Sequence, residues 1–164
     1  MPYMHADDLP TEVLTELGRV TWAAIKLEDY TESMCSFIDP ANPRTDRRSV
    51  GEKIKDAKKV LAGWPASAVR DEAATWLERA RPAIERRNAA LHATPLVWIE
   101  PGRRSDRRFL LGEMPRKGSS YTERPMTVDS LAELRSVIED AADGWRDLIL
   151  AVSAEYQRQR SAEQ

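Results

Sequence analysis

The chain has 164 residues, enough for one domain with a sizeable core, and it combines 41% hydrophobic with 32% charged residues. This balance excludes a disordered chain, and no apolar run approaches the roughly 20 residues that cross a bilayer. Cys35 is the single cysteine, which excludes an internal disulfide, and two histidines add too few ligands for a zinc site. The segment MPYMHADDLP has no signal-peptide core. We therefore expect a cytoplasmic protein with no membrane segment, no metal and no cofactor.

The net charge of −2 conceals an uneven distribution of charge along the chain. Residues 81–124 hold ten arginine and lysine residues against five acidic ones, a local charge of +5, which leaves −7 for the rest of the chain. A positive zone in an acidic protein suggests an anionic ligand, phosphate above all. A solvated charged hairpin is the alternative, and charge alone favours it.

Apolar residues three and four apart predict a long first helix from about Thr11 to Phe37, with Pro10 in its first turn. Its apolar face comprises Leu14, Leu17, Val20, Ala24, Leu27, Thr31, Met34 and Ile38. The segment DPANPRTD at 39–46 ends this helix and offers Thr45 or Asp46 as the cap of a second one. The second helix runs to about Gly63 and places on one face Val50, Ile54, Ala57 and Leu61.

A third helical segment begins near Ala66. Its apolar positions are Val69, Ala73, Leu77, Ala80, Ile84 and Leu91. Pro82 lies inside this pattern, where it removes a backbone hydrogen bond, so we expect a kink or a break. Residues 83–93 still read as helix.

Residues 96–126 change character. LVWIE, PGRRSD and RRFLLGE predict strand, turn and strand, and MPRKGSSYTERPM reads as irregular. Thr127 or Asp129 then caps the last helix, which Gly144 weakens by about 1 kcal/mol. The apolar positions of this helix are Leu131, Leu134, Ile138, Ala141, Trp145, Leu148 and Val152.

These elements predict an all-α fold in a single domain over residues 1–164. We expect an antiparallel bundle of four to five helices, with a β-hairpin-like insertion at 96–126 before the last helix. Residues 160–164 should form a frayed tail.

The stretch ERRNAALHATPLVW, residues 85–98, gathers polar groups where the third helix ends. Asn88 and His92 are four residues apart and share a helix face, whereas Arg87 points elsewhere but is long enough to reach the same groove. A guanidinium buried beside the core needs an anion, a carboxylate or a groove of a second subunit. A histidine that simply interacts with the helix dipole is the alternative.

Residues 87–92, Arg-Asn-Ala-Ala-Leu-His, resemble the signature of HEPN domains, in which an arginine and a polar residue precede a histidine. These domains are small helical bundles, many of them ribonucleases in defence and toxin–antitoxin systems. The long first helix with Trp22 and Leu27-Glu28-Asp29 near its middle, and the long closing helix, also look like small single-domain members. Arg86 is the alternative motif arginine, and Ala93-Thr94-Pro95 departs from the Gly or Ser step often seen after the histidine.

The resemblance implies a metal-independent endoribonuclease. His92 would exchange protons with the ribose 2′-hydroxyl or the leaving 5′-oxygen, Arg87 would stabilise charge on the phosphate, and Asn88 would support them. It also implies a homodimer whose two motifs form one composite cleft for RNA, with an antitoxin protein as a possible partner. Such a protein would act as a toxin or a phage-defence effector.

Several alternatives stay open at this point. Candidate RNA-binding residues are Arg86, Arg103, Arg104, Arg107 and Arg108, although arginines in a turn are often merely solvated. Glu28 or Asp29 is a candidate ion-pair partner of the motif arginine, although ordinary helix-surface charge is the more common situation. The chain could also be a non-catalytic HEPN-like module that binds nucleotides or RNA, or a structural helical dimer that recruits a protein partner.

Overall fold

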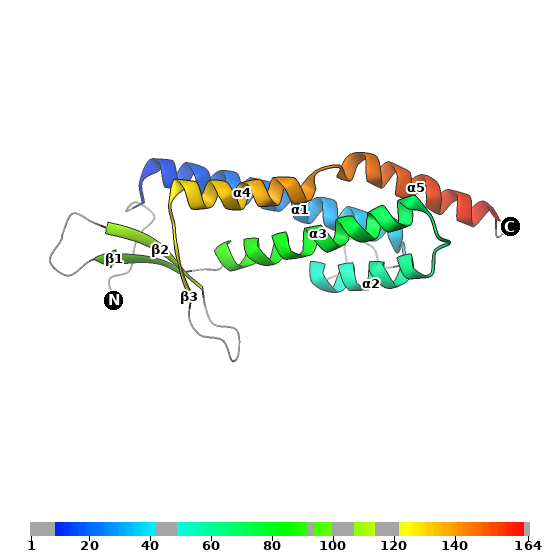
Figure 1. Ribbon diagram of the computed structural model, residues 1–164, viewed down its shortest axis with the longest axis horizontal. Coiled ribbons are helices and arrows are strands. Elements are labelled where there is room, and N and C mark those ends of the chain that lie inside the picture. Colours follow the sequence, from blue (N-terminus) through cyan, green and yellow to red (C-terminus); the bar gives the residue numbers. More distant parts are fainter. Residues whose placement is uncertain (1–8, 42–48, 92–93, 100–106, 114–121, 163–164) are drawn as a thin grey trace.

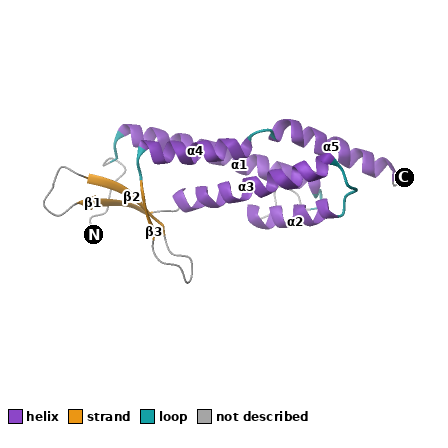
Figure 2. Ribbon diagram, viewed as in Figure 1, coloured by secondary structure: helices purple, strands orange, loops and turns teal. Residues whose placement is uncertain are grey.

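The computed structural model describes residues 9–41, 49–91, 94–99, 107–113 and 122–162, and of residues 88–125 only the backbone. Its elements in chain order are α1 (Thr11–Ile38), α2 (Val50–Ala62), α3 (Ala68–Leu91), β1 (Thr94–Ile99), β2 (Arg107–Glu113), β3 (Thr122–Pro125), α4 (Val128–Ala142) and α5 (Trp145–Ala162). The helices form an elongated bundle, and the strands gather beyond one of its ends (Figures 1 and 2). The predicted all-α helical bundle is confirmed.

Helix α1, like α3, contacts all four other helices of the bundle. It runs parallel to α4 and α5, as two interactions along its length show. Near its start, Glu16 accepts a hydrogen bond from Nε of Arg135 at 2.6 Å, and near its end the ring of Tyr30 stacks on that of Trp145 at 4.0 Å.

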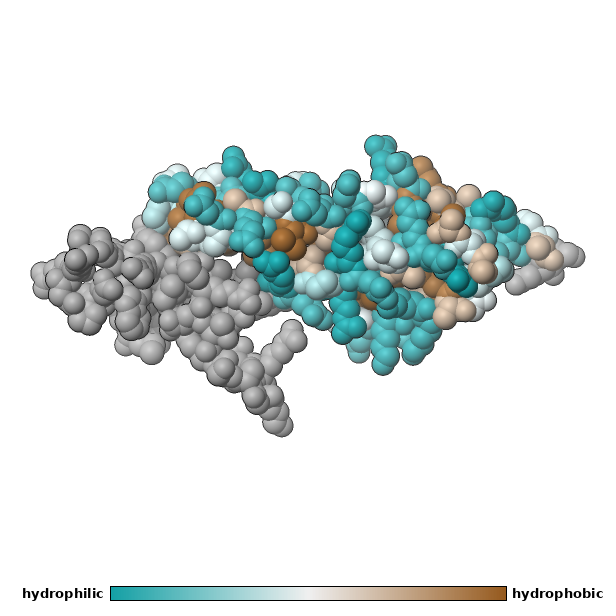
Figure 3. Space-filling view, in the orientation of Figure 1, coloured by the Kyte–Doolittle hydropathy of each residue, from teal (hydrophilic) through white to brown (hydrophobic). Residues whose placement is uncertain are grey.

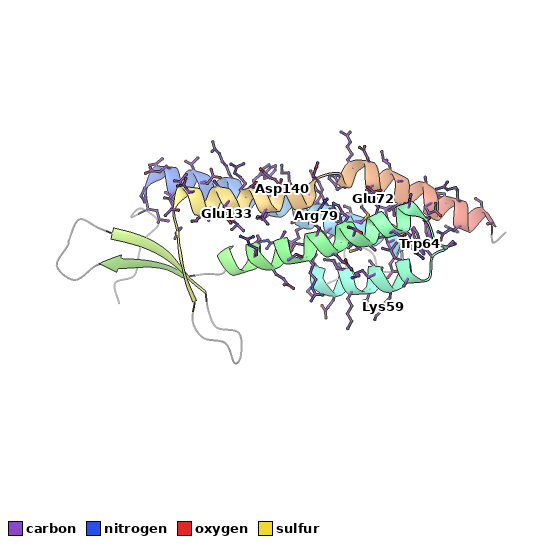
Figure 4. All side chains as sticks on the ribbon, viewed as in Figure 1. Lys59, Trp64, Glu72, Arg79, Glu133 and Asp140 are labelled. Carbon is purple, nitrogen blue, oxygen red and sulfur yellow. The ribbon has the colours of Figure 1, made fainter. Side chains whose placement is uncertain are left out.

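Helix α3 runs antiparallel to α4. At the C-terminal end of α3, Arg86 faces Glu133 in the first half of α4, and earlier in α3 Arg79 donates to the backbone carbonyl of Asp143 after α4. Figure 4 shows Glu133 and Arg79 at these two levels of the bundle. Because α1 is parallel to α4, α1 and α3 are antiparallel to each other.

The core follows the predicted apolar stripes closely. All four predicted positions of α2 are at most 8% exposed, as are Ala73, Leu77, Ala80 and Ile84 of α3. The start of α1 is the exception, because Leu14 is 39% exposed and Val13 takes the inward place at 5%. Val13 lies seven residues before Val20, about two helical turns, and therefore on the same side of α1.

The prediction of a single closing helix is wrong, because this segment is divided into α4 and α5. Asp143 adopts an extended conformation, and Gly144 has a φ of 72°, in the left-handed region that favours glycine. The carbonyl of Asp143 accepts hydrogen bonds from Nε1 of Trp76 at 3.2 Å and from Arg79 at 2.8 Å. Contacts with α3 therefore hold the break in place. Helix α5 continues to Ala162, so residues 160–162 of the expected frayed tail are helical.

The break anticipated at Pro82 does not occur, and α3 continues through it to Leu91. Pro82 lies on the exposed side of the helix. Water can there satisfy the carbonyl of Glu78, which loses its backbone donor, so the cost of an interior proline is reduced.

The helix caps were predicted with mixed success. Thr127 caps α4 as expected, in a capping box with Ser130. Helix α2 begins later than expected, and Ser49 caps it in a capping box with Glu52. The predicted caps Thr45 and Asp46 lie outside the described residues.

The strands between α3 and α4 form an antiparallel sheet in the order β1–β2–β3. Strands β1 and β2 pair from Thr94 opposite Gly112 to Ile99 opposite Arg107. Strand β3 pairs with β2 and lies in the segment that was expected to be irregular, so that expectation is wrong. Two helices, and not one, follow this sheet.

The face of the bundle seen in Figure 3 is largely hydrophilic, with small separated hydrophobic patches. In the described part of the chain, no helix combines the length and the apolar character that crossing a membrane requires.

Candidate functional site

Arg87 lies four residues before the end of α3, and its side chain reaches α1. Its Nη2 donates a hydrogen bond to Oε2 of Glu28, 59 residues away in the sequence. The Arg87 side chain is only 12% exposed, whereas that of Glu28 is 39% exposed. A guanidinium buried to this extent needs an anionic acceptor, and α1 supplies one. The ion pair weighed for Glu28 is therefore present.

Helical geometry explains why these two side chains meet. Leu27 and Thr31 of α1 are buried in the core, so Glu28 lies on the flank of the buried stripe, at the boundary between core and solvent. On α3, Ile84 is 6% exposed, and Arg87 follows it by three residues on nearly the same side. Each residue thus stands at the edge of its helix's core face, where neighbouring helices approach each other.

The neighbouring Arg86 points in a different direction. Its Nη2 lies 3.8 Å from Oε1 of Glu133 on α4, and both side chains are well exposed, at 42% and 75%. An exposed pair at this separation contributes little stability. The two adjacent arginines therefore face different helices: Arg87 is bonded to α1, and Arg86 lies near α4. Arg87, chosen as the motif arginine, is the one held firmly.

The remaining predicted site residues are only partly described. Asn88 belongs to α3 by its backbone, whereas His92, Arg103 and Arg104 lie outside the described residues. Arg107 and Arg108 are the first residues of β2, opposite Ile99 and Trp98 of β1. Strand β2 contacts α3, so these two arginines belong to an element that lies beside the helix carrying the motif.

Glu133 is the site residue that the sequence analysis missed. It lies 47 residues after Arg86 and on a different helix, and no local pattern relates the two. Its exposed position in α4 resembles that of any solvated acid. Only the antiparallel arrangement of α3 and α4 brings it near the arginine pair.

Each of the two guanidinium groups has a carboxylate from a neighbouring helix nearby, Glu28 for Arg87 and Glu133 for Arg86. Glu28 holds the guanidinium of Arg87 in one orientation, and the Arg87 side chain is 12% exposed to solvent. Within the ranges that the structure describes, no cluster of three or more His, Cys, Asp or Glu side chains could hold a metal ion. No family model, curated protein or solved structure matches the chain.

Proposed function

We propose that the protein is a metal-independent endoribonuclease of the HEPN type that acts as a homodimer. The observation that supports this proposal is the state of Arg87, which is largely buried and bonded to Glu28. An arginine with a purely solubilising role would extend into water, as its neighbour Arg86 does. Arg87 is instead oriented by a carboxylate from another helix, which is how a protein positions a group that must contact a substrate.

The chemistry follows from the side chains that the motif supplies. A base takes the proton from the ribose 2′-hydroxyl, the 2′-oxygen attacks phosphorus, and the bond from phosphorus to the 5′-oxygen breaks as that oxygen receives a proton. Imidazole suits both proton transfers near neutral pH, so His92 is assigned to them. Arg87 stabilises the negative charge that grows on the phosphate oxygens, and Asn88 supports these groups. The products carry a 2′,3′-cyclic phosphate and a 5′-hydroxyl.

Two proton transfers call for two imidazoles, and the motif holds one. A second copy of the chain supplies the other if the two motifs face each other across a two-fold axis. The arginines at 86, 103, 104, 107 and 108 then guide the RNA by contacts with its phosphates. The biological role that fits is a toxin or phage-defence effector, held in check by an antitoxin protein.

The test is an RNA cleavage assay with the purified protein and mixed RNA, in the presence of EDTA. We expect cleavage without metal, products that end in a cyclic phosphate, and no cleavage of DNA, which lacks the 2′-hydroxyl. Replacing His92 by Ala should lower the rate by about 10²–10⁴-fold, and replacing Arg87 by Ala by about 10²–10³-fold. Arg81→Ala is the matched control, because Arg81 is 62% exposed on the same helix and pairs locally with Glu85.

The outcomes separate the three possible functions. Full cleavage by the His92→Ala protein would refute the proposal. Tight RNA binding without cleavage by the unaltered protein would instead indicate the non-catalytic binding module. Neither binding nor cleavage would leave the structural dimer that recruits a protein partner.

A further inference from the structure

Helix α1 carries a second apolar face, opposite the one it buries. Leu14, Trp22 and Ile25 are 39%, 62% and 52% exposed. With Gly18 they fall within an arc of about 80°, at about 100° per residue of helix. We call these four residues the outer face of α1.

This outer face differs from the other exposed apolar residues of the described chain. Phe37, Val128 and Leu150 are also exposed, but each lies at a different place in the fold. Single exposed hydrophobic residues are normal in any protein, whereas several on one helix face that include tryptophan indicate an interaction surface.

Gly18 gives the outer face a shape that fits a second copy of itself. A Cβ added at Gly18 would meet no heavy atom within 4 Å, so packing within the chain does not require a glycine there. Glycine in a helix interior costs about 1 kcal/mol relative to alanine. Here it leaves a notch between the bulky side chains of Leu14 and Trp22. A small site and a large side chain one turn apart are self-complementary, because each can meet the other across a two-fold axis.

We propose that the outer face of α1 is the homodimer interface, with the two α1 helices antiparallel and Trp22 of each copy packed over Gly18 of the other. The two-fold axis then crosses α1 near residue 20, midway between these positions. Tryptophan is the side chain most often found to dominate the binding energy of an interface.

This pairing turns the two candidate sites to the same side of the dimer seam, and in this respect it rests on the proposed function. Glu28 lies beside the outer face, on the flank of α1 turned toward α3. A two-fold axis that relates antiparallel helices keeps corresponding flanks on the same side of the seam. Both pairs of Arg87 and Glu28 therefore lie along one side of it, with the two Glu28 positions about 24 Å apart along the helix axes, at about 1.5 Å per residue. Because α3 is antiparallel to α1, residues 88–91 of α3 run toward the N-terminal half of α1 (Figure 1). That half of α1 contains Gly18 and Trp22.

The experiment measures self-association of the full chain by sedimentation equilibrium. The unaltered protein should dimerise, and Trp22→Glu should raise the dimer dissociation constant at least about 30-fold, the loss typical of a dominant interface residue. Leu150→Glu is the control, since Leu150 is 65% exposed on α5 and should be neutral. Circular dichroism establishes that each variant is folded.

The Gly18→Leu variant distinguishes a specific dimer interface from nonspecific association. Leucine favours the helix and adds apolar surface, so nonspecific association would be unchanged or stronger. Filling the notch against Trp22 of the partner should instead weaken the dimer at least about 10-fold. A monomeric parent protein, a Trp22→Glu variant that dimerises normally, or a Gly18→Leu variant that associates as well as the parent would each overturn the inference. A dimer of this kind that does not cleave RNA would refute only the proposed function.

Discussion

The pairing of Glu28 with Arg87 predicts an unequal response to removing either charge. Glu28→Gln keeps the shape of the side chain but removes one carboxylate partner from a guanidinium that is 12% exposed. Arg87→Met keeps the aliphatic stem and leaves a carboxylate that is 39% exposed and can regain water. An isolated buried charge costs about 3–5 kcal/mol and an exposed pair contributes about 0.2–1 kcal/mol. This half-buried pair lies between these limits, so Glu28→Gln should cost about 2 kcal/mol and Arg87→Met about 1 kcal/mol or less.

The assay is urea unfolding of both single variants and of the double variant at neutral pH, arranged as a double-mutant cycle. We expect a coupling energy of about 1–2 kcal/mol between the two positions. In the RNA assay Glu28→Gln should also lower the cleavage rate, because the guanidinium is no longer held in one orientation, whereas Arg81→Ala should not. A coupling energy below about 0.3 kcal/mol, or an Arg87→Met variant less stable than Glu28→Gln, would show that the pair does not position Arg87 as we infer.

Two further predictions concern the bundle. Gly144→Ala should lower the free energy of unfolding by about 1–2 kcal/mol. The cost is conformational, because φ at this position is 72° and an added Cβ meets no neighbour. Gly51→Ala, inside α2 and equally unobstructed, should instead raise the melting temperature. Glu16 is held chiefly by its hydrogen bond from Arg135, which lowers the pKa of the carboxyl below its ordinary value of 4.5. The stability that Glu16 contributes is therefore present above that value and is lost as the pH falls through the lowered pKa. Between pH 6 and 3, the free energy of unfolding should fall less steeply with decreasing pH in Glu16→Gln than in the unaltered protein. An unchanged slope would contradict this reasoning.

The candidate site shows how much residue spacing along the chain can predict about a functional site. Arg87 and Asn88 could be proposed as a functional group because they stand at a helix end beside an apolar stripe. The spacing could not say which of Arg86 and Arg87 is buried, since adjacent residues differ by only about 100° around a helix. The neighbours on α1 and α4 decide it, because Glu28 and Glu133 lie on different sides of the end of α3.

The closing helix shows the opposite case, in which a local signal for the break is present in the sequence. Asp143-Gly144 is a turn sequence, and glycine is the residue that most often ends helices in the left-handed conformation. The apolar spacing of the closing segment nevertheless continues unbroken through Trp145 to Val152, because α5 packs its own apolar stripe on the same core. Pro82 did not mark a helix end, since α3 continues through this exposed proline to Leu91.

The amino-acid sequence alone determined the helical segments, most of their buried positions and the cap at Thr127, because these depend on residues within one or two turns of each other. Tertiary structure decided the third strand and the contact between Arg87 and Glu28, and it holds in place the break that Asp143-Gly144 signals locally. These depend on groups brought together from distant parts of the chain, such as the carbonyl of Asp143 and the side chain of Trp76. Periodicity records which side of a helix avoids water, but it does not record which neighbour that helix meets.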